Sequence, residues 1–265
     1  MIKLKSLCFV LTTLLIHIGC TEKIEIDLNL SRPQFVIEGN VSTSGESTVK
    51  ISKSVNFDES NIFPKVENAN VEISDNFGNN EILTETSPGF YYSSSFGGIE
   101  NRRYSLKVSI NDQVLESTSH IPTKVDFDSL IVIKTDVPNI PGVEENEFYH
   151  EVRVKFKDPS NSINYYRFVE TVNNEILNSF VFDDILTNGN NVTFQLQDFT
   201  RELVSGDVYK VEMQCIDEYV FDYFNSFGNT QSGTATPANP YSNILGSELG
   251  YFNAHTSEIK QIIIQ

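Results

Sequence analysis

The chain has 265 residues, with 36 acidic against 19 basic side chains, a formal net charge of −17 and no tryptophan. This charge argues against a nucleic-acid partner, because a protein that binds phosphates needs a basic face to release counterions. Disorder is excluded as well, since 19 Phe and 11 Tyr supply the bulky side chains from which a core is built. The length allows one large β domain or two smaller ones.

The first 19 residues predict an export signal. Lys3 and Lys5 form a positive start, and the apolar run at 7–16 is shorter than the stretch of about 20 residues that a spanning helix needs. Gly19 before Cys20 resembles the lipobox of bacterial lipoproteins. We therefore expect cleavage between Gly19 and Cys20 and acylation of Cys20, and several acyl chains would give stable membrane anchoring. The alternative is an ordinary secretory signal that happens to meet a cysteine.

Cysteine usage fits this prediction. Cleavage would remove Cys8 and lipid would occupy Cys20, so only Cys215 would keep a free thiol, without a partner for an internal disulfide. Cys215 shares the apolar face of an alternating strand with Tyr209, and we interpret it as a buried structural thiol, because reactive cysteines lie in electropositive, partly exposed places. Loss of residues 1–19, which hold two lysines and no acid, takes the net charge from −17 to −19.

Residues 20–33 are expected to form a tether in which isoleucines alternate with acids. From 34 to 122 the chain is a series of short alternating segments separated by Gly, Asn and Pro, without helical periodicity. This spacing predicts an antiparallel β-sandwich. Its strands are expected at 35–41, 49–52, 71–73, 81–84, 90–92, 106–110 and 113–119.

A second β-rich domain is expected from 123 to 265. One helix is predicted at 218–227, with Asp217 as its cap and Gly228 at its end. The fold class is therefore mainly β, with an N-terminal antiparallel sandwich followed by a second β-rich domain that has one short helix. The strands of the second domain are expected at 127–133, 152–157, 165–172, 175–182, 192–196, 208–216 and 258–264, with a hairpin turn at 173–174.

The histidines give no sign of a metal site. His120, His150 and His255 remain after processing, and no pair of them has the close spacing of zinc ligands. We expect neither a metal nor a cofactor. Residues 75–79 place oxygen ligands near a glycine, but they lack the spaced bidentate Glu of an EF-hand and are interpreted as a hairpin turn.

Acidic pairs raise the possibility of a hydrolase with a general acid and a general base. Adjacent acids are expected in so acidic a chain, and Asp183 with Asp184 is interpreted as a solvated turn at a strand end. The short pattern Asp128-Ser129-Leu130 resembles an O-glycosylation signal of Bacteroidetes and leaves modification of Ser129 open. The four candidate acids are Asp126, Asp128, Asp183 and Asp184.

Several segments together resemble one known family. They lie at 34–39, 49–54, 66–73, 88–91, 239–244 and 249–254, behind the lipobox and acidic tether. The pattern is similar to Bacteroidetes outer-membrane lipoproteins classed as a domain of unknown function, commonly encoded beside TonB-dependent receptors. Residues 34–122 also resemble an immunoglobulin-like or carboxypeptidase-regulatory-like sandwich, a module without catalytic residues. The resemblance implies outer-membrane placement, a link to receptor-mediated uptake and no catalytic residue.

The leading hypothesis is a non-enzymatic, lipid-anchored outer-membrane protein, on the cell surface or the periplasmic face. It would be an accessory binding or assembly partner of a TonB-dependent transporter, with the small-molecule or glycan ligand left open. The alternatives are a surface adhesin or envelope structural protein, and a carboxylate-dependent hydrolase. The segment 239–254 is predicted as a partner-facing or fold-closing loop. Its candidate residues are Asn239, Pro240, Tyr241, Asn243, Tyr251 and Phe252.

Overall fold

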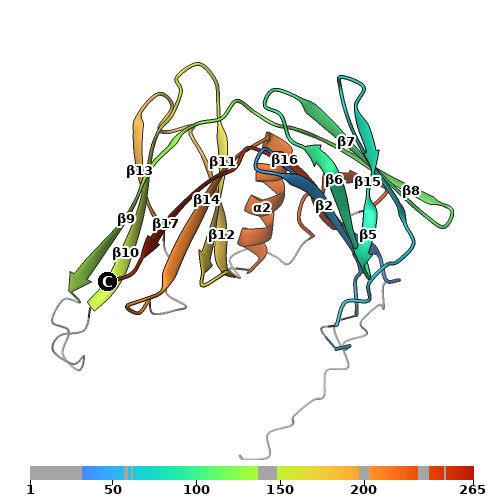
Figure 1. Cartoon of the computed structure of the whole chain (residues 1–265), viewed down its shortest axis with the longest axis horizontal. Helices are drawn as coiled ribbons and strands as arrows, with labels where there is room; N and C mark the ends of the chain where they lie inside the picture. Colours follow the sequence, from blue (N-terminus) through green and yellow to red (C-terminus); the bar gives the residue numbers. More distant parts are fainter. Residues whose placement is uncertain are drawn as a thin grey trace, which may run out of the picture. The chain divides into compact units, whose positions relative to one another are not determined.

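Short strands with alternating burial dominate the chain (Figure 1). The computed structural model describes residues 32–56, 59–60, 62–136, 148–196, 203–231, 239–247 and 249–265. The predicted export signal, Cys20 and most of the tether lie outside these residues. The strands of the unit Pro33–Gln265 form two sandwiches, each with its own apolar core. The predicted mainly β fold is confirmed.

The first sandwich consists of two five-stranded sheets, in the orders β16-β1-β2-β6-β5 and β15-β8-β7-β3-β4. Along β7 every second side chain is buried, so Leu106 and Val108 point into the core while Lys107 faces outward. The strands from the N-terminal half are β1 (Phe35–Ser42), β2 (Glu46–Lys53), β3 (Asn70–Asp75), β4 (Asn80–Ile82), β5 (Thr84–Ser87), β6 (Phe90–Gly97), β7 (Arg103–Ile110) and β8 (Gln113–His120).

The strand predicted at 81–84 is two strands in the structure. β4 pairs with β3, and β5 pairs with β6 in the opposite sheet. Leu83 lies between them and is buried in the core of the first sandwich. The chain therefore crosses from one sheet to the other at the residue that fills the space between the sheets.

The C-terminal part of the chain returns to the first sandwich. β15 (Ile244–Leu245) pairs with β8, and β16 (Leu249–His255) pairs in parallel with β1. Parallel strands need a long crossover connection, and here the chain between β1 and β16 includes every strand of the second sandwich except β17, which follows β16. Phe252 is fully buried in the first core. The prediction of a loop across 239–254 is therefore wrong for these two strands, which close the fold by pairing.

Gly250 is the residue that allows β16 to approach β1. Its φ is +101°, a conformation that residues with a side chain rarely adopt. A Cβ atom at this position would lie 2.0 Å from the carbonyl oxygen of Ile37. The parallel pair thus depends on the absence of a side chain at Gly250.

The second sandwich has sheets in the orders β13-β10-β9 and β12-β11-β14-β17. Its core is rich in aromatic rings, with Phe156, Tyr166 and Phe168 all buried. Asn173 and Asn174 both have positive φ and form the predicted turn between β11 and β12. The strands are β9 (Phe127–Asp136), β10 (Phe148–Lys157), β11 (Tyr165–Val172), β12 (Glu175–Asp183), β13 (Asn191–Leu196), β14 (Val208–Ile216) and β17 (Glu258–Ile263).

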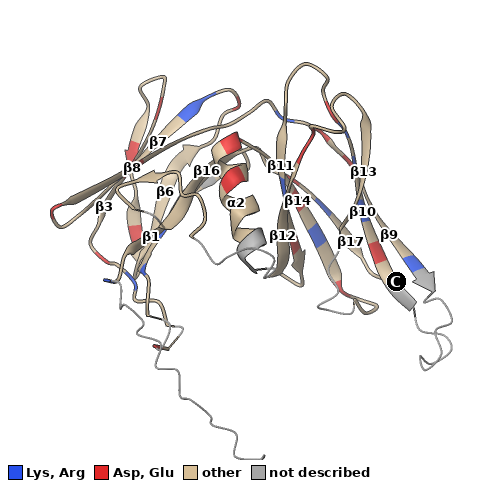
Figure 2. Ribbon diagram, turned by 180° about the vertical axis from the view of Figure 1, so that it is seen from behind, with Lys and Arg blue, Asp and Glu red and all other residues tan. Residues whose placement is uncertain are grey.

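The helix α2 (Glu218–Gln231) begins where it was predicted and ends later. Asp217 caps it, since its Oδ1 accepts a hydrogen bond of 3.0 Å from the amide of Val220. The predicted end at Gly228 is wrong, because this glycine keeps a helical conformation and does not adopt the positive φ of a terminating residue. Figure 2 shows acidic residues in the first half of the helix.

Contacts join the two sandwiches near α2. The other carboxyl oxygen of Asp217, Oδ2, accepts hydrogen bonds from Ser119 Oγ at 2.6 Å and from the amide of His120 at 2.8 Å. Tyr251 of β16 packs against Phe224 of α2, with ring centroids 4.9 Å apart. The division at 122 and 123 stays a prediction about domains, and the structure adds that the core of the first sandwich includes residues from 244–254.

Candidate binding site

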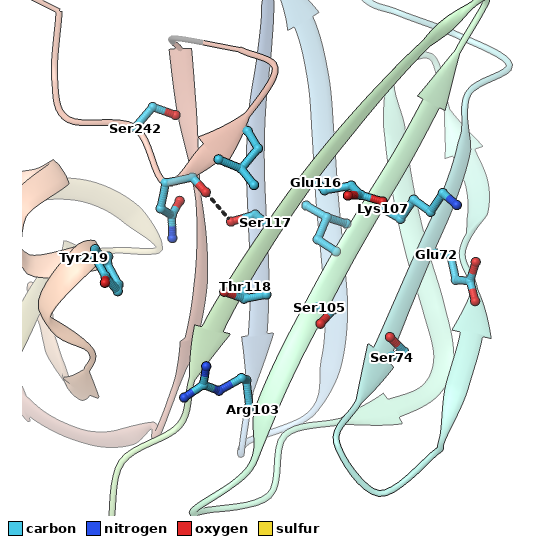
Figure 3. A pocket seen from close by; sticks show the side chains of 13 residues that line it. Glu72, Ser74, Arg103, Ser105, Lys107, Glu116, Ser117, Thr118, Tyr219 and Ser242 are labelled. Carbon is cyan, nitrogen blue, oxygen red and sulfur yellow. Dashed lines mark hydrogen bonds between the residues drawn. The ribbon is translucent and has the colours of Figure 1, made fainter.

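A groove of about 760 Å³ lies on the outer face of the first sandwich (Figure 3). Its floor is formed by β3, β7 and β8, and its wall by the first turn of α2 and the segment that contains β15. Its lining residues are Glu72, Ser74, Arg103, Ser105, Leu106, Lys107, Glu116, Ser117, Thr118, Tyr219, Ser242, Asn243 and Leu245.

The register of the strands arranges the floor in rows. Lys107 is paired with Glu72 on one side and with Glu116 on the other. Residues directly opposite in an antiparallel pair share one face of the sheet, so the ammonium group stands between two carboxylates, as Figure 3 shows. A second row consists of three hydroxyl side chains, Ser74, Ser105 and Thr118.

The wall of the groove is held by the core of the first sandwich. The side chain of Asn243 donates a hydrogen bond of 2.8 Å to the carbonyl of Phe252 and accepts one of 2.9 Å from its amide. The carbonyl of Asn243 accepts a hydrogen bond of 2.7 Å from Ser117 Oγ, drawn in Figure 3. Tyr219 of α2 and Leu245 of β15 expose 67% and 72% of their surface. The groove therefore has a fixed frame and two exposed apolar residues.

Several polar ends in the groove are available to a ligand. Within the part of the chain that the structure describes, the side chains of Arg103, Lys107 and Glu116 make no hydrogen bond or ion pair. The side chain of Glu72 accepts one hydrogen bond, of 3.1 Å, from Asn80 Nδ2. The pairing of the strands thus places these charged side chains close together, and most of their donor and acceptor atoms stay available for hydrogen bonds to a ligand.

The residues predicted for a partner-facing or fold-closing loop have different environments. Asn239 is exposed and Pro240 half-buried, and Tyr241 exposes 73% of its surface. Asn243 lines the groove. The ring of Tyr251 packs against α2, and Phe252 is fully buried, so Phe252 closes the fold and does not face a partner.

The floor of the groove was missed by reasoning from the sequence. Its residues are the outward members of alternating strands, such as Lys107 between the buried Leu106 and Val108. Alternation predicts that these side chains face outward, but it does not reveal which strands are neighbours. Only the pairing of β3, β7 and β8 places Glu72, Lys107 and Glu116 in one row.

The four acids considered for a hydrolase are not brought together. Asp126 and Asp128 are exposed near the start of β9, whereas Asp183 ends β12 in the opposite sheet and Asp184 follows it. The interpretation of Asp183 and Asp184 as a solvated turn is wrong for Asp184, which is 0% exposed. Loop residues 185–190 fold beside it and remove its carboxyl group from water.

Asp184 has a different acidic neighbour, Asp158, which is also buried. Asp158 accepts hydrogen bonds from the hydroxyl of Tyr166 and, at 2.9 Å, from the amide of Gly189. Burial, and then the charge of Asp158, raise the pKa of Asp184 above its usual range. Asp184 therefore retains its proton more readily than a free carboxyl group does.

Cys215 and the turn at Asp75 match their predictions. Cys215 is 2% exposed, its Sγ accepts a hydrogen bond of 3.3 Å from the amide of Val125, and burial raises the pKa of its thiol. Asp75 accepts hydrogen bonds from the amides of Phe77 and Asn79, at 2.9 and 3.0 Å, and forms an ion pair of 2.7 Å with Arg102. The structural thiol and the hairpin turn are both confirmed.

The histidines and acids of the described residues do not form a cluster of metal ligands. His120 and His150 are half-buried, and His255 is buried with its Nδ1 2.9 Å from the carbonyl of Thr256. Among the described residues, no three His, Cys, Asp or Glu side chains gather as metal ligands. Ser129, left open for glycosylation, is half-buried on β9 opposite Lys155.

The structure is a mainly β protein of two sandwiches, with a groove lined by side chains on the outer face of a sheet. The chain belongs to the family described as Domain of unknown function (DUF4249), whose model matches residues 21–261. No curated protein matches the chain. In the described part of the chain, no helix combines the length and the apolar character needed to cross a membrane.

Proposed function

We propose that the protein is a lipoprotein anchored in the outer membrane through acylated Cys20, at the cell surface. It acts there as an accessory binding or assembly partner of a TonB-dependent nutrient transporter. The groove carries the binding role, since its fixed frame presents polar side chains with unused hydrogen-bonding capacity. The apolar run at 7–16, followed by Gly19 and Cys20, supports the anchor, and the resemblance to Bacteroidetes lipoproteins supports the transporter.

The length of the tether is compatible with this role. Residues 20–33 can span at most about 45 Å when fully extended. After loss of residues 1–19 the chain would carry a net charge of −19, which anionic lipid headgroups repel. Acyl chains would therefore hold the protein at the membrane while charge keeps the folded part away from the lipid surface. The groove then stays accessible to a ligand or to a receptor.

Binding is favoured over hydrolysis by the environment of the carboxyl groups. A general acid or base must come within hydrogen-bonding distance of its substrate. Asp158 and Asp184 are 1% and 0% exposed, and Asp158 is engaged by Tyr166 and Gly189. The buried pair therefore lies within the second sandwich, out of reach of a substrate, whereas the polar groups that line the groove are open to a ligand.

Affinity isolation from gently solubilised membranes tests the transporter role. The full-length protein should recover a TonB-dependent receptor, whereas the Cys20→Ser variant, which lacks the acylation site, should recover much less because it is not held beside the receptor. Repeated isolation without any such receptor would contradict the proposal. Loss of attachment or envelope integrity on gene deletion, with nutrient uptake intact, would instead favour an adhesin or a structural protein.

Mass analysis of the peptide that carries Cys20 tests the anchor separately. We expect a mature chain that begins at Cys20 and bears acyl chains. Protease treatment of intact cells should then cleave the folded part, because it faces outward. An unmodified Cys20 contradicts the anchor, and complete protection from protease contradicts the placement at the cell surface.

A further inference from the structure

The charged side chains of the groove balance each other. Glu72 and Glu116 carry negative charge and Arg103 and Lys107 carry positive charge, although the whole chain has a net charge of −17. An anionic ligand would meet a carboxylate on each side of Lys107, and a cationic ligand would meet both bases. Two acidic and two basic side chains in the groove therefore favour a ligand without net charge.

Recognition in the groove has to come from side chains. The floor is the face of a sheet, and the backbone groups of β7 are engaged in ladders with β3 and β8. A peptide that binds by adding a strand requires a free sheet edge, and β7, in the middle of the floor, has none. The available groups are carboxylates that accept, bases that donate, and the hydroxyls of Ser74, Ser105 and Thr118 that do both. Such a mixture suits a ligand that is itself rich in hydroxyl groups.

The wall adds a flat apolar surface. Tyr219 exposes 67% of its surface beside the polar floor, and Figure 3 shows its side chain on the helix at the margin of the groove. An aromatic ring packs against apolar C–H groups while the tyrosine hydroxyl reaches polar ones. Sugar rings combine these two surfaces, with C–H groups on a face and hydroxyls around the edge. The volume of about 760 Å³ lies in the usual range of ligand sites, about 300 to 1,000 Å³.

The geometry points to a neutral oligosaccharide as the ligand of the groove, with Tyr219 as the stacking surface and the rows of β3, β7 and β8 as the hydrogen-bonding floor. This inference deepens the proposed function and rests on it only in taking the groove as the binding surface. Which sugar and which linkage fit the groove is identified by comparing the probes below.

Isothermal titration calorimetry of the full chain in detergent, with maltohexaose, cellohexaose, xylohexaose and mannohexaose as probes, tests the inference. At least one probe should bind, and Tyr219→Ala should weaken that binding by about tenfold or more. Tyr92→Ala is the control, because Tyr92 is also an exposed tyrosine but lies on β6 in the opposite sheet and does not line the groove. Equal losses in the two variants, or no binding of any probe, would overturn the inference.

Salt separates a neutral ligand from a charged one. The affinity for the bound hexasaccharide should stay within about twofold between about 50 and about 500 mM NaCl, because screening acts on charges. Tighter binding of hexagalacturonate, with a steep salt dependence, would overturn the assignment to neutral sugars. Affinity isolation of the receptor with the Tyr219→Ala variant tests the transporter role separately from sugar binding. Sugar binding without a receptor defeats only the transporter role, and a receptor without sugar binding defeats only this inference.

Discussion

The two sandwiches bury different kinds of side chain and close in different ways. The first core is mainly aliphatic, its buried polar side chains include the serines Ser47 and Ser93, and it takes Phe252 from the far end of the chain. The second core stacks aromatic rings, for example Phe168 on Phe180 with centroids 5.5 Å apart, and buries carboxyl groups such as that of Asp184.

This contrast teaches where each sandwich is vulnerable. The first depends on contacts between residues distant in sequence, such as the hydrogen bond of 2.7 Å from Ser247 Oγ to the carbonyl of Phe35. The second contains ionisable groups that folding removes from water, so its stability depends on pH. Substitutions in β16 should therefore weaken the first sandwich, and a rise in pH above 3.8, the ordinary pKa of an Asp carboxyl group, should act on the second through Asp184.

The largest effect is expected for Phe252→Ala in β16. The ring is fully buried against Gly39 and Leu106, and its removal leaves a cavity that should lower the free energy of unfolding by about 3 to 5 kcal/mol. Urea denaturation followed by circular dichroism measures the loss. Leu245→Ala in β15, which is largely exposed, is the control and should cost less than about 0.5 kcal/mol. A similarly small loss for Phe252→Ala would show that the first sandwich does not need β16.

Asp217→Ala tests the connection between the sandwiches. The substitution removes the cap of α2 and the two hydrogen bonds from Ser119 and His120, so we expect a loss of about 1 to 3 kcal/mol in thermal or urea unfolding. Asp222→Ala on the exposed side of the same helix should cost less than about 0.5 kcal/mol, since Asp222 makes no hydrogen bond or ion pair with the residues that the structure describes. Equal effects of the two variants would contradict a joining role for Asp217.

Asp75→Ala probes acid sensitivity in the first sandwich. Burial alone would raise the pKa of Asp75, but hydrogen bonds from Asn79, Arg102 and Phe77 hold it at about 2, below the ordinary 3.8. The folded state therefore favours the carboxylate, and this stabilisation is present above pH 3.8 and is lost as the pH falls toward 2.

At neutral pH the Asp75→Ala variant should be less stable by about 1 to 2 kcal/mol. Its difference from the unaltered chain should shrink on acidification. Urea denaturation as a function of pH measures both changes, and a difference that is constant from neutral pH down to pH 2 would refute the assignment.

Asp184→Asn should have the smallest effect and the opposite sign. Burial and the neighbouring charge of Asp158 raise the pKa of Asp184, so the folded state holds the proton more tightly than the unfolded chain does. The unaltered protein should then lose stability as the pH rises from the ordinary 3.8 through the raised pKa. The variant cannot ionise at this position, and we expect it to be as stable as the unaltered chain, or slightly more so, at neutral pH. A variant that keeps the full decline with pH would exclude Asp184 as its source.

The features that could be predicted from the sequence are those set by interactions between residues close together in the chain. The strands were predictable from the alternation of apolar and polar residues, and the turn at 173–174 from its two adjacent asparagines, because both signals are local in the chain. The cap of α2 was predictable for the same reason, whereas its end was not, because Gly228 can continue a helix as well as terminate it. The burial of Asp184 was missed because a loop folds over a residue that looks like the end of an exposed strand.

The sequence by itself determined the mainly β class and the structural thiol at Cys215, since both depend on residue type and local spacing, and the export signal at 1–19 stays a prediction of the same kind. Only the tertiary structure decided that β16 pairs with β1, that Asp158 meets Asp184, and that Glu72, Lys107 and Glu116 share a row. The reason is physical: alternation fixes which face of a strand is buried, while the choice of neighbouring strand depends on how distant segments fill one core.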